Sequence, residues 1–233
     1  MRIALATMLL LALTRDTYAW DTPMDSAIRF FEALPARGPA AMLRAVRPAP
    51  ATLAERIRAV DMLPESGVVT PDHKEREKLT LLDSVLAYGD RAGTLEIMVI
   101  DVPQAVVALH QRAVVLVSRP ALRLLSGREL QAMVAHEIGH DYFWREFERT
   151  VAEGDRRGRQ ELELKCDGIA VLTLVALRLD PGSLTNGLRK QTRFNEMLGA
   201  DANAADYPPL QDRQRFITTV RNFALRQVGT PTR

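Results

Sequence analysis

The sequence predicts an α+β fold in which helices dominate and a small, partly antiparallel sheet is the minor part. Helical patterns with a 3.6-residue period fill most of the chain. Three short runs rich in Val, Ile and Leu interrupt them: "TLEIMVID", "QAVVALH" and "RAVVLVS". Only a turn at His110–Gln111 separates the last two runs, so we expect a hairpin there. A chain of 233 residues, 47% hydrophobic, can form one domain with a buried core, or one domain with a small helical annex.

The N-terminus has the layout of a secretory signal peptide. One positive charge precedes an apolar run from Ile3 to Leu13, and the small residues Thr17 and Ala19 follow two positions apart. We expect residues 1–19 to be a leader that is cut after Ala19, and the mature protein to be exported to the periplasm or secreted. The apolar run is too short for a stable membrane span, although an uncleaved anchor is the alternative.

Composition limits the partners and the means of stabilisation. The formal net charge of +2 gives no reason to expect nucleic-acid binding. After the leader, no apolar run is long enough to cross a bilayer. The single cysteine, Cys166, excludes an internal disulfide, and we expect it to be a small buried side chain. The fold must therefore be held by its core and, where one binds, by a metal.

Residues 20–70 are expected to form a helical annex to the main domain, residues 71–233. Two short amphipathic helices are predicted in the annex, "DSAIRFFEAL" and "TLAERIRAVDML", and the second opens on a capping box of Thr52 and Glu55. Prolines break up the rest of the segment. A pro-segment is the alternative interpretation. Helices are expected in the main domain at residues 70–90, 126–150, 160–179, 184–198 and 210–226, with a loop at 152–159.

The stretch "VAHEIGHDY" carries the strongest chemical signal in the chain. It lies in the predicted helix at residues 126–150, which opens on a second capping box, Ser126 and Glu129. Positions i and i+4 share a helix face, so His136 and His140 can hold one zinc ion through their ring nitrogens. Glu137 lies about 100° around the helix, where it can reach a water molecule on the metal. This is the H-E-x-x-H arrangement of metallopeptidases, with Glu137 as the candidate catalytic base.

A third metal ligand should come from a different helix. Catalytic zinc sites usually have three protein ligands and keep one position for water. No histidine follows His140, which leaves a carboxylate. Glu163 is the best candidate, because it lies where the next helix becomes apolar and an unpaired charge would be costly. Asp167, one turn later, can accept the free ring N–H of a ligating histidine. Glu161 is the competitor for the ligand role.

Three segments in order, "ELQAMVAHEIGH", "ELKCDGIAV" and "YPPLQDR", resemble one group of zinc endopeptidases. The group includes the prenyl-protein (CaaX) proteases, the heat-shock membrane protease and periplasmic barrel-assembly quality-control proteases. The resemblance covers roughly residues 95–213. It implies a zincin-like domain with an H-E-x-x-H zinc helix. It also implies that Glu163 is the third zinc ligand and Asp167 its downstream aspartate.

The resemblance also suggests residues that contact the substrate. Members of the group have an edge strand above the zinc helix that pairs with extended substrate, and "PQAVVALH" is similar to it in position. This implies substrate binding by four residues: Gln104, Ala105, Val106 and Val107.

Several positions depart from the pattern of the group. Gln104 replaces the usual asparagine, Cys166 stands where alanine is common, and Asp141 places a charge directly after His140. Arg213 matches the late arginine of the group. Tyr207 stands where histidine is frequent, and its hydroxyl could donate a hydrogen bond to a developing oxyanion. Tyr207 and Arg213 are therefore candidate catalytic residues.

Three functions are compatible with these residues. The first is an exported zinc endopeptidase that cleaves protein or peptide substrates in extended or unfolded segments. The second is a non-catalytic, zinc-stabilised binding or chaperone-like module, and the third is a non-peptidase zinc hydrolase. Glu137 favours the first over the second, because a structural metal site has no need of a base. The sequence does not separate the first from the third.

Overall fold

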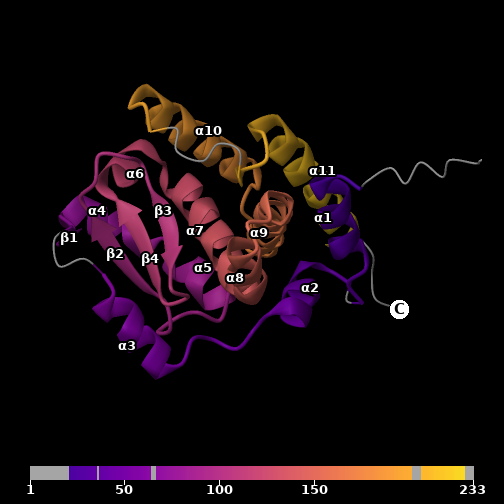
Figure 1. Cartoon of the computed structure of the whole chain (residues 1–233), viewed down its shortest axis with the longest axis horizontal. Helices are drawn as coiled ribbons and strands as arrows, with labels where there is room; N and C mark the ends of the chain where they lie inside the picture. Colours follow the sequence, from indigo (N-terminus) through magenta and orange to yellow (C-terminus); the bar gives the residue numbers. More distant parts are fainter. Residues whose placement is uncertain (1–20, 36, 64–66, 201–205, 229–233) are drawn as a thin grey trace, which may run out of the picture.

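A computed structural model describes residues 21–35, 37–63, 67–200 and 206–228. Helices form most of this part of the chain and surround a small mixed sheet, which confirms the expected α+β class with helices dominant (Figure 1). The predicted leader, residues 1–19, lies outside the described residues. Within them, no helix combines the length and the apolar character needed to cross a membrane.

The elements follow one another in an order close to the predicted one. The helices before β2 are α1 (Pro23–Glu32), α2 (Pro39–Val46), α3 (Leu53–Asp61), α4 (His73–Thr80) and α5 (Asp83–Tyr88). The strands are β1 (Val68–Val69), β2 (Glu96–Ile100), β3 (Val107–His110) and β4 (Val114–Ser118). The remaining helices are α6 (Arg119–Leu124), α7 (Gly127–Tyr142), α8 (Trp144–Ala152), α9 (Arg156–Ala176), α10 (Gly182–Met197) and α11 (Leu210–Val228).

The sheet has the strand order β1-β2-β4-β3 in the described part of the chain. Strands β3 and β4 pair antiparallel, which confirms the predicted hairpin, whereas β2 and β4 pair parallel. The turn between β3 and β4 contains two non-glycine residues with positive φ, Gln111 at 48° and Arg112 at 61°. The order places β3 at one edge of the sheet. The opposite edge, β1, was not predicted, because two residues are too few for a period-2 pattern.

Two predicted helices are each divided in two. Residues 70–90 form α4 and α5, with the break at Leu81–Leu82, and residues 126–150 form α7 and α8. At the second break, Phe143 leaves the helical conformation with φ −112° and ψ 25°, and its ring is buried. Helical periodicity continues through both breaks, so local sequence could not indicate them. Both capping boxes predicted from sequence are formed, at Thr52 and at Ser126.

Proline and glycine misled the prediction in two places. Pro39 is one of the prolines expected to break up the annex, but it lies in the first turn of α2, where its missing N–H costs nothing. The predicted loop at 152–159 is mostly helix, because the Asp155 side chain accepts the Gly158 amide at 2.9 Å and caps α9. Arg156 and Arg159 therefore lie on α9 rather than in a loop.

Helix α9 runs through the middle of the molecule. Every residue from Leu162 to Leu174 is buried, as the apolar second half of the predicted helix indicated. Helix α7 packs along α9 on the side of the sheet, and α1, α2 and α11 pack on it away from the sheet (Figure 1). Helix α7 therefore lies between α9 and β3, with Leu130, Val134 and Ile138 buried.

The helical annex shares its core with the rest of the chain. Phe31 of α1 is buried in the same hydrophobic cluster as the residues of α7 and α9. A Cβ atom at Gly168 of α9 would lie 2.2 Å from ring atoms of Phe31, so only glycine leaves room for the ring. Helix α1 is thus part of the main core. The glycine that it contacts on α9 directly follows Asp167 in the sequence.

We predict that Phe31→Ala lowers the free energy of unfolding of the whole chain by about 3–5 kcal/mol, because it leaves a cavity against α9. Denaturant unfolding followed by circular dichroism measures this. Ile57→Ala, in the same annex at a side chain that is 53% exposed, is the control and should change stability by less than about 0.5 kcal/mol. A separate early transition, with the main transition unchanged, would contradict a shared core.

Candidate functional site

The predicted metal-binding histidines lie on one face of α7. The ring centroids of His136 and His140 are 5.0 Å apart. His136, Glu137 and His140 can each offer one ligand atom, and these atoms lie within 4.8 Å of one another. His136 and Glu137 are buried, and His140 is partly buried. All three line a cleft of about 710 Å³ between β3, α7, α8 and α10.

Glu163 of α9 faces both histidines. Its Oε2 lies 3.4 Å from His136 Nε2, and its Oε1 lies 3.5 Å from His140 Nε2. The Oε2 atom is buried and has no hydrogen-bond partner among the described residues. The competing candidate, Glu161, instead pairs with Lys165 at 2.8 Å. The structure therefore brings together His136, His140 and Glu163 and leaves Glu161 out of the cluster.

The close approach of α7 and α9 allows Glu163 to reach the histidines. A Cβ atom at Gly139 would lie 2.6 Å from Cys166 Cα, which is far inside a normal contact. Cys166 is fully buried, as predicted for a small side chain, and burial raises the pKa of its thiol well above the usual value. Sequence reasoning missed Gly139, although its place between the two histidines was a usable signal for a close helix contact.

Asp167 and Arg213 support His136 from the other side. Asp167 Oδ1 lies 2.9 Å from His136 Nδ1, as the sequence predicted for a carboxylate one turn after Glu163. Arg213 of α11 donates to both carboxylate oxygens, from Nε at 2.8 Å and from Nη2 at 2.6 Å. A hydrogen bond at Nδ1 fixes the ring orientation and directs Nε2 toward Glu163. Arg213 thus contacts Asp167 directly, a partnership that sequence reasoning did not include.

The pKa values of the cluster reflect these neighbours. Burial disfavours the charged form of His136, but the hydrogen bond to Asp167 and the negative charges of Asp167 and Glu163 outweigh it and raise the pKa to about 10. Burial lowers the pKa of His140 to about 4. Burial opposes the ionised form of Glu163 too, yet His140 and His136 bring its pKa down to about 2. At neutral pH, His140 and Glu163 are therefore already in the protonation states that bind a metal, whereas His136 must release a proton to bind one.

Glu137 is held by the edge strand. The backbone amide of Leu109 in β3 donates to Glu137 Oε2 at 2.8 Å. Burial raises the pKa of this carboxyl to about 7. The amide of Ser118 donates to the carbonyl of Val106 at 2.9 Å, so the alternation of an antiparallel ladder turns the amides of Val107 and Leu109 away from β4. The candidate base therefore lies beside the open edge of the sheet.

Of the four residues predicted to bind substrate, the structure places Val107 in the lining of the cleft. Gln104, Ala105 and Val106 precede β3, and the strand residues that line the cleft are Val107, Ala108 and Leu109. The amide and the carbonyl of Ala105 are both bonded to the Asn195 side chain, at 2.9 and 3.0 Å. The amide of Val106 donates to Ser118 Oγ at 2.8 Å. These side chains bind backbone groups of Ala105 and Val106 that the sequence had assigned to substrate, so the part of the edge that lines the cleft begins at Val107.

Tyr207 and two aromatic residues of α8 also line the cleft. Tyr207 is 49% exposed. The negative charge of Glu163, together with burial, raises the pKa of Tyr207 to about 12, so its hydroxyl keeps a proton to donate. The two residues of α8 are Trp144 and Phe147, and the break at Phe143 turns α8 toward the opening.

The residues of this site fit a zinc ion. Two imidazole nitrogens and one carboxylate converge, and this is the donor set of a catalytic zinc site with three protein ligands. The buried Glu163 Oε2 without a hydrogen-bond partner is an acceptor that a cation would satisfy. Neither a protein-family model nor a curated protein matches this chain.

We predict that Gly139→Ala destabilises the protein by about 1–3 kcal/mol, because the added methyl group meets the backbone of Cys166. Urea unfolding measures the change. Gly187→Ala is the matched control, since its Cβ would meet only side-chain atoms: those of the flexible Met133 from 3.2 Å and Glu129 Cβ at 3.6 Å. Alanine has the higher helix propensity, so the control should be neutral or mildly stabilising. Equal stability of both variants would mean that α7 and α9 can separate without cost.

Proposed function

We propose that the protein is an exported zinc endopeptidase with a zincin-like fold, which hydrolyses peptide bonds in extended or unfolded protein segments. Kinship with the zinc endopeptidases that its three sequence segments resemble belongs to the same proposal. The observation that carries it is the convergence of Glu163 on the Nε2 atoms of His136 and His140. The Oε2 atom of Glu163 is buried, lies 3.6 Å from Arg213 Nη2 and has no hydrogen-bond partner among the described residues.

His136, His140 and Glu163 would hold the ion, and Asp167 would fix the ring of His136. When bound, zinc polarises a carbonyl group and lowers the pKa of water to near neutrality. Arg213 keeps Asp167 ionised: burial opposes the charged carboxylate, and the guanidinium charge outweighs it and lowers the pKa of Asp167. In this scheme Arg213 acts through Asp167 and His136.

Glu137 is positioned to move the proton. As the water oxygen bonds to the peptide carbonyl carbon, Glu137 accepts a proton from that water. Glu137 then delivers the proton to the amine nitrogen as the C–N bond breaks, so the products are a carboxylate and a free amine. Tyr207 has a protonated hydroxyl in the cleft and would donate to the carbonyl oxygen as negative charge develops there.

An extended substrate would add to the sheet along β3. Val107 and Leu109 direct their amides to the open edge, which lines the cleft. The Leu109 amide already binds Glu137, so Val107 is the strand residue whose amide would pair with substrate. Pairing through main-chain hydrogen bonds reads little of the side chains. We therefore expect broad sequence preference and selection for segments that are not folded.

Glu163→Ala should weaken zinc affinity by at least about 100-fold, because it removes a ligand rather than a residue that supports one. Metal analysis and competition with a chromogenic chelator measure this. Glu161→Ala is the matched control, because Glu161 lies two residues before Glu163 on α9 and, in the described structure, pairs with Lys165 at 2.8 Å. It should retain zinc. Full zinc occupancy in Glu163→Ala would exclude this ligand.

Glu137→Gln should keep zinc and fold but reduce turnover by about 10²–10⁴-fold, because it removes the proton acceptor and keeps the shape of the side chain. Cleavage of an unfolded protein, with and without chelator, measures this. If the parent prevents aggregation of that protein but never cleaves it, the chain is a binding module and the endopeptidase proposal fails.

A further inference from the structure

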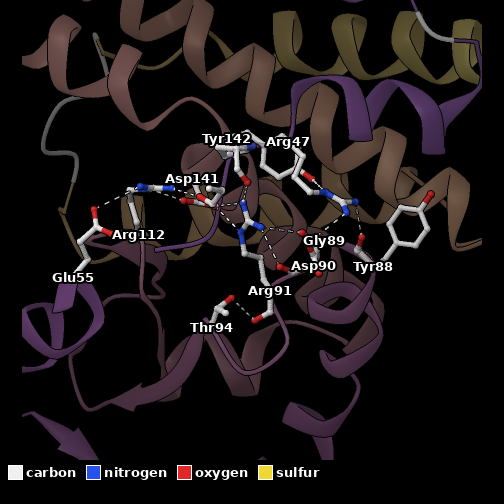
Figure 2. Close-up of polar contacts among 12 residues, drawn as sticks. Arg47, Glu55, Tyr88, Gly89, Asp90, Arg91, Thr94, Arg112, Asp141 and Tyr142 are labelled. Carbon is white, nitrogen blue, oxygen red and sulfur yellow. Dashed lines mark hydrogen bonds and ion pairs between the residues drawn. The ribbon is translucent and has the colours of Figure 1, made fainter. Parts of the chain in front are cut away.

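Asp141 is a buried charge with no part in the proposed chemistry, although it follows His140 directly. It is 1% exposed. Two arginines converge on its carboxylate (Figure 2): Arg91 Nε donates to Oδ2 at 2.7 Å, and Arg112 Nε donates to Oδ1 at 2.7 Å. Glu55 of α3 lies 3.8 Å from Arg112 and adds a second negative charge. Two positive charges thus meet two negative ones at the end of α7.

The same arginines bind the chain segment that joins α2 to α3. Arg91 Nη2 donates to the carbonyl of Pro48 at 3.1 Å, and Arg112 Nη2 donates to the carbonyl of Ala49 at 2.8 Å. The neighbouring Arg47 donates to the hydroxyl of Tyr142 at 3.1 Å (Figure 2). The last two residues of α7 are therefore bound to the segment after α5, to the β3–β4 turn and to the annex.

Arg112 gives this cluster its relation to the cleft. It lies in the turn that follows β3, with its backbone in the left-handed region. Because its side chain is bound to Asp141, it fixes the end of that strand. Glu137 and Asp141 are one turn apart on α7 and share a face. Glu137 binds β3 at Leu109, and Asp141 binds the turn three residues later. Strand β3 is thus aligned along α7 at two successive points.

We propose that the Arg91–Asp141–Arg112 cluster is a positioning device that sets the separation of β3 from α7. Through that separation it would fix where an extended substrate lies relative to Glu137 and the two histidines, which makes the inference dependent on the proposed function. A buried ion pair contributes little net stability compared with apolar packing, but it constrains geometry. Asp141 therefore acts on the reaction through β3 and α7 without touching the substrate.

The test uses Arg112, whose side chain is 18% exposed, because replacing Asp141 would leave two guanidinium groups unpaired and endanger the fold. Arg112→Gln should speed hydrogen exchange at the Leu109 amide about tenfold and raise KM for an unfolded protein substrate about tenfold, with a smaller change in kcat. Zinc affinity should stay at the parent value. Arg112→Lys keeps the charge and should bring both the exchange rate and KM part of the way back to the parent values.

Glu75→Gln is the control for a general loss of stability. Glu75 is a buried carboxylate in α4 that pairs with Arg119 at 3.5 Å. If Leu109 exchanges no faster in Arg112→Gln than in Glu75→Gln at equal stability, the inference is overturned. If the parent cleaves no protein, the proposed function fails, whereas the exchange rate of the Leu109 amide still decides whether the cluster positions β3.

Discussion

The candidate site depends on how closely α7 approaches α9 at Gly139 and Cys166. Helices that meet through ordinary side chains lie about 8–10 Å apart, and a glycine permits the near end of that range. At this separation one imidazole is held from two directions by a single turn of α9: Glu163 faces Nε2 of His136, and Asp167 faces Nδ1. Both contacts need the same spacing, so the helix contact sets the metal site and its support together.

Helix α7 is bound by two separate groups of buried charges. An isolated charge in a protein interior is very costly, so each charge needs partners close by. On one side, Asp167 and Arg213 tie α7 to α9 and α11 through His136. On the other, Asp141 ties the end of α7 to the sheet and the annex. The helix that carries the candidate chemistry is thereby anchored to the layers on both of its sides, which limits its freedom to shift.

Features that rest on short-range patterns could be predicted from the sequence. The capping boxes, the hairpin and the burial along α9 follow from residues a few positions apart. The grouping of His136 and His140 follows from helix spacing, and Glu163 was added to it by the cost of burying an unpaired charge. Features that rest on distant partners could not. The Asn195 side chain accepts a hydrogen bond from the Ala105 amide, 90 positions earlier, and no local sequence pattern indicates this contact. The break at Phe143 is similarly set by tertiary packing, and it turns α8 toward the cleft.

The open edge of β3 also bears on edge-to-edge aggregation. An exposed sheet edge is a template for edge-to-edge aggregation, and proteins commonly shorten, charge or cover such edges. Here one edge, β1, is only two residues long, and the other lies inside a cleft beside the carboxylate of Glu137. In the part of the chain that the structure describes, the two edges of the sheet thus follow two of these patterns, since one edge is short and the other is covered by the walls of a cleft.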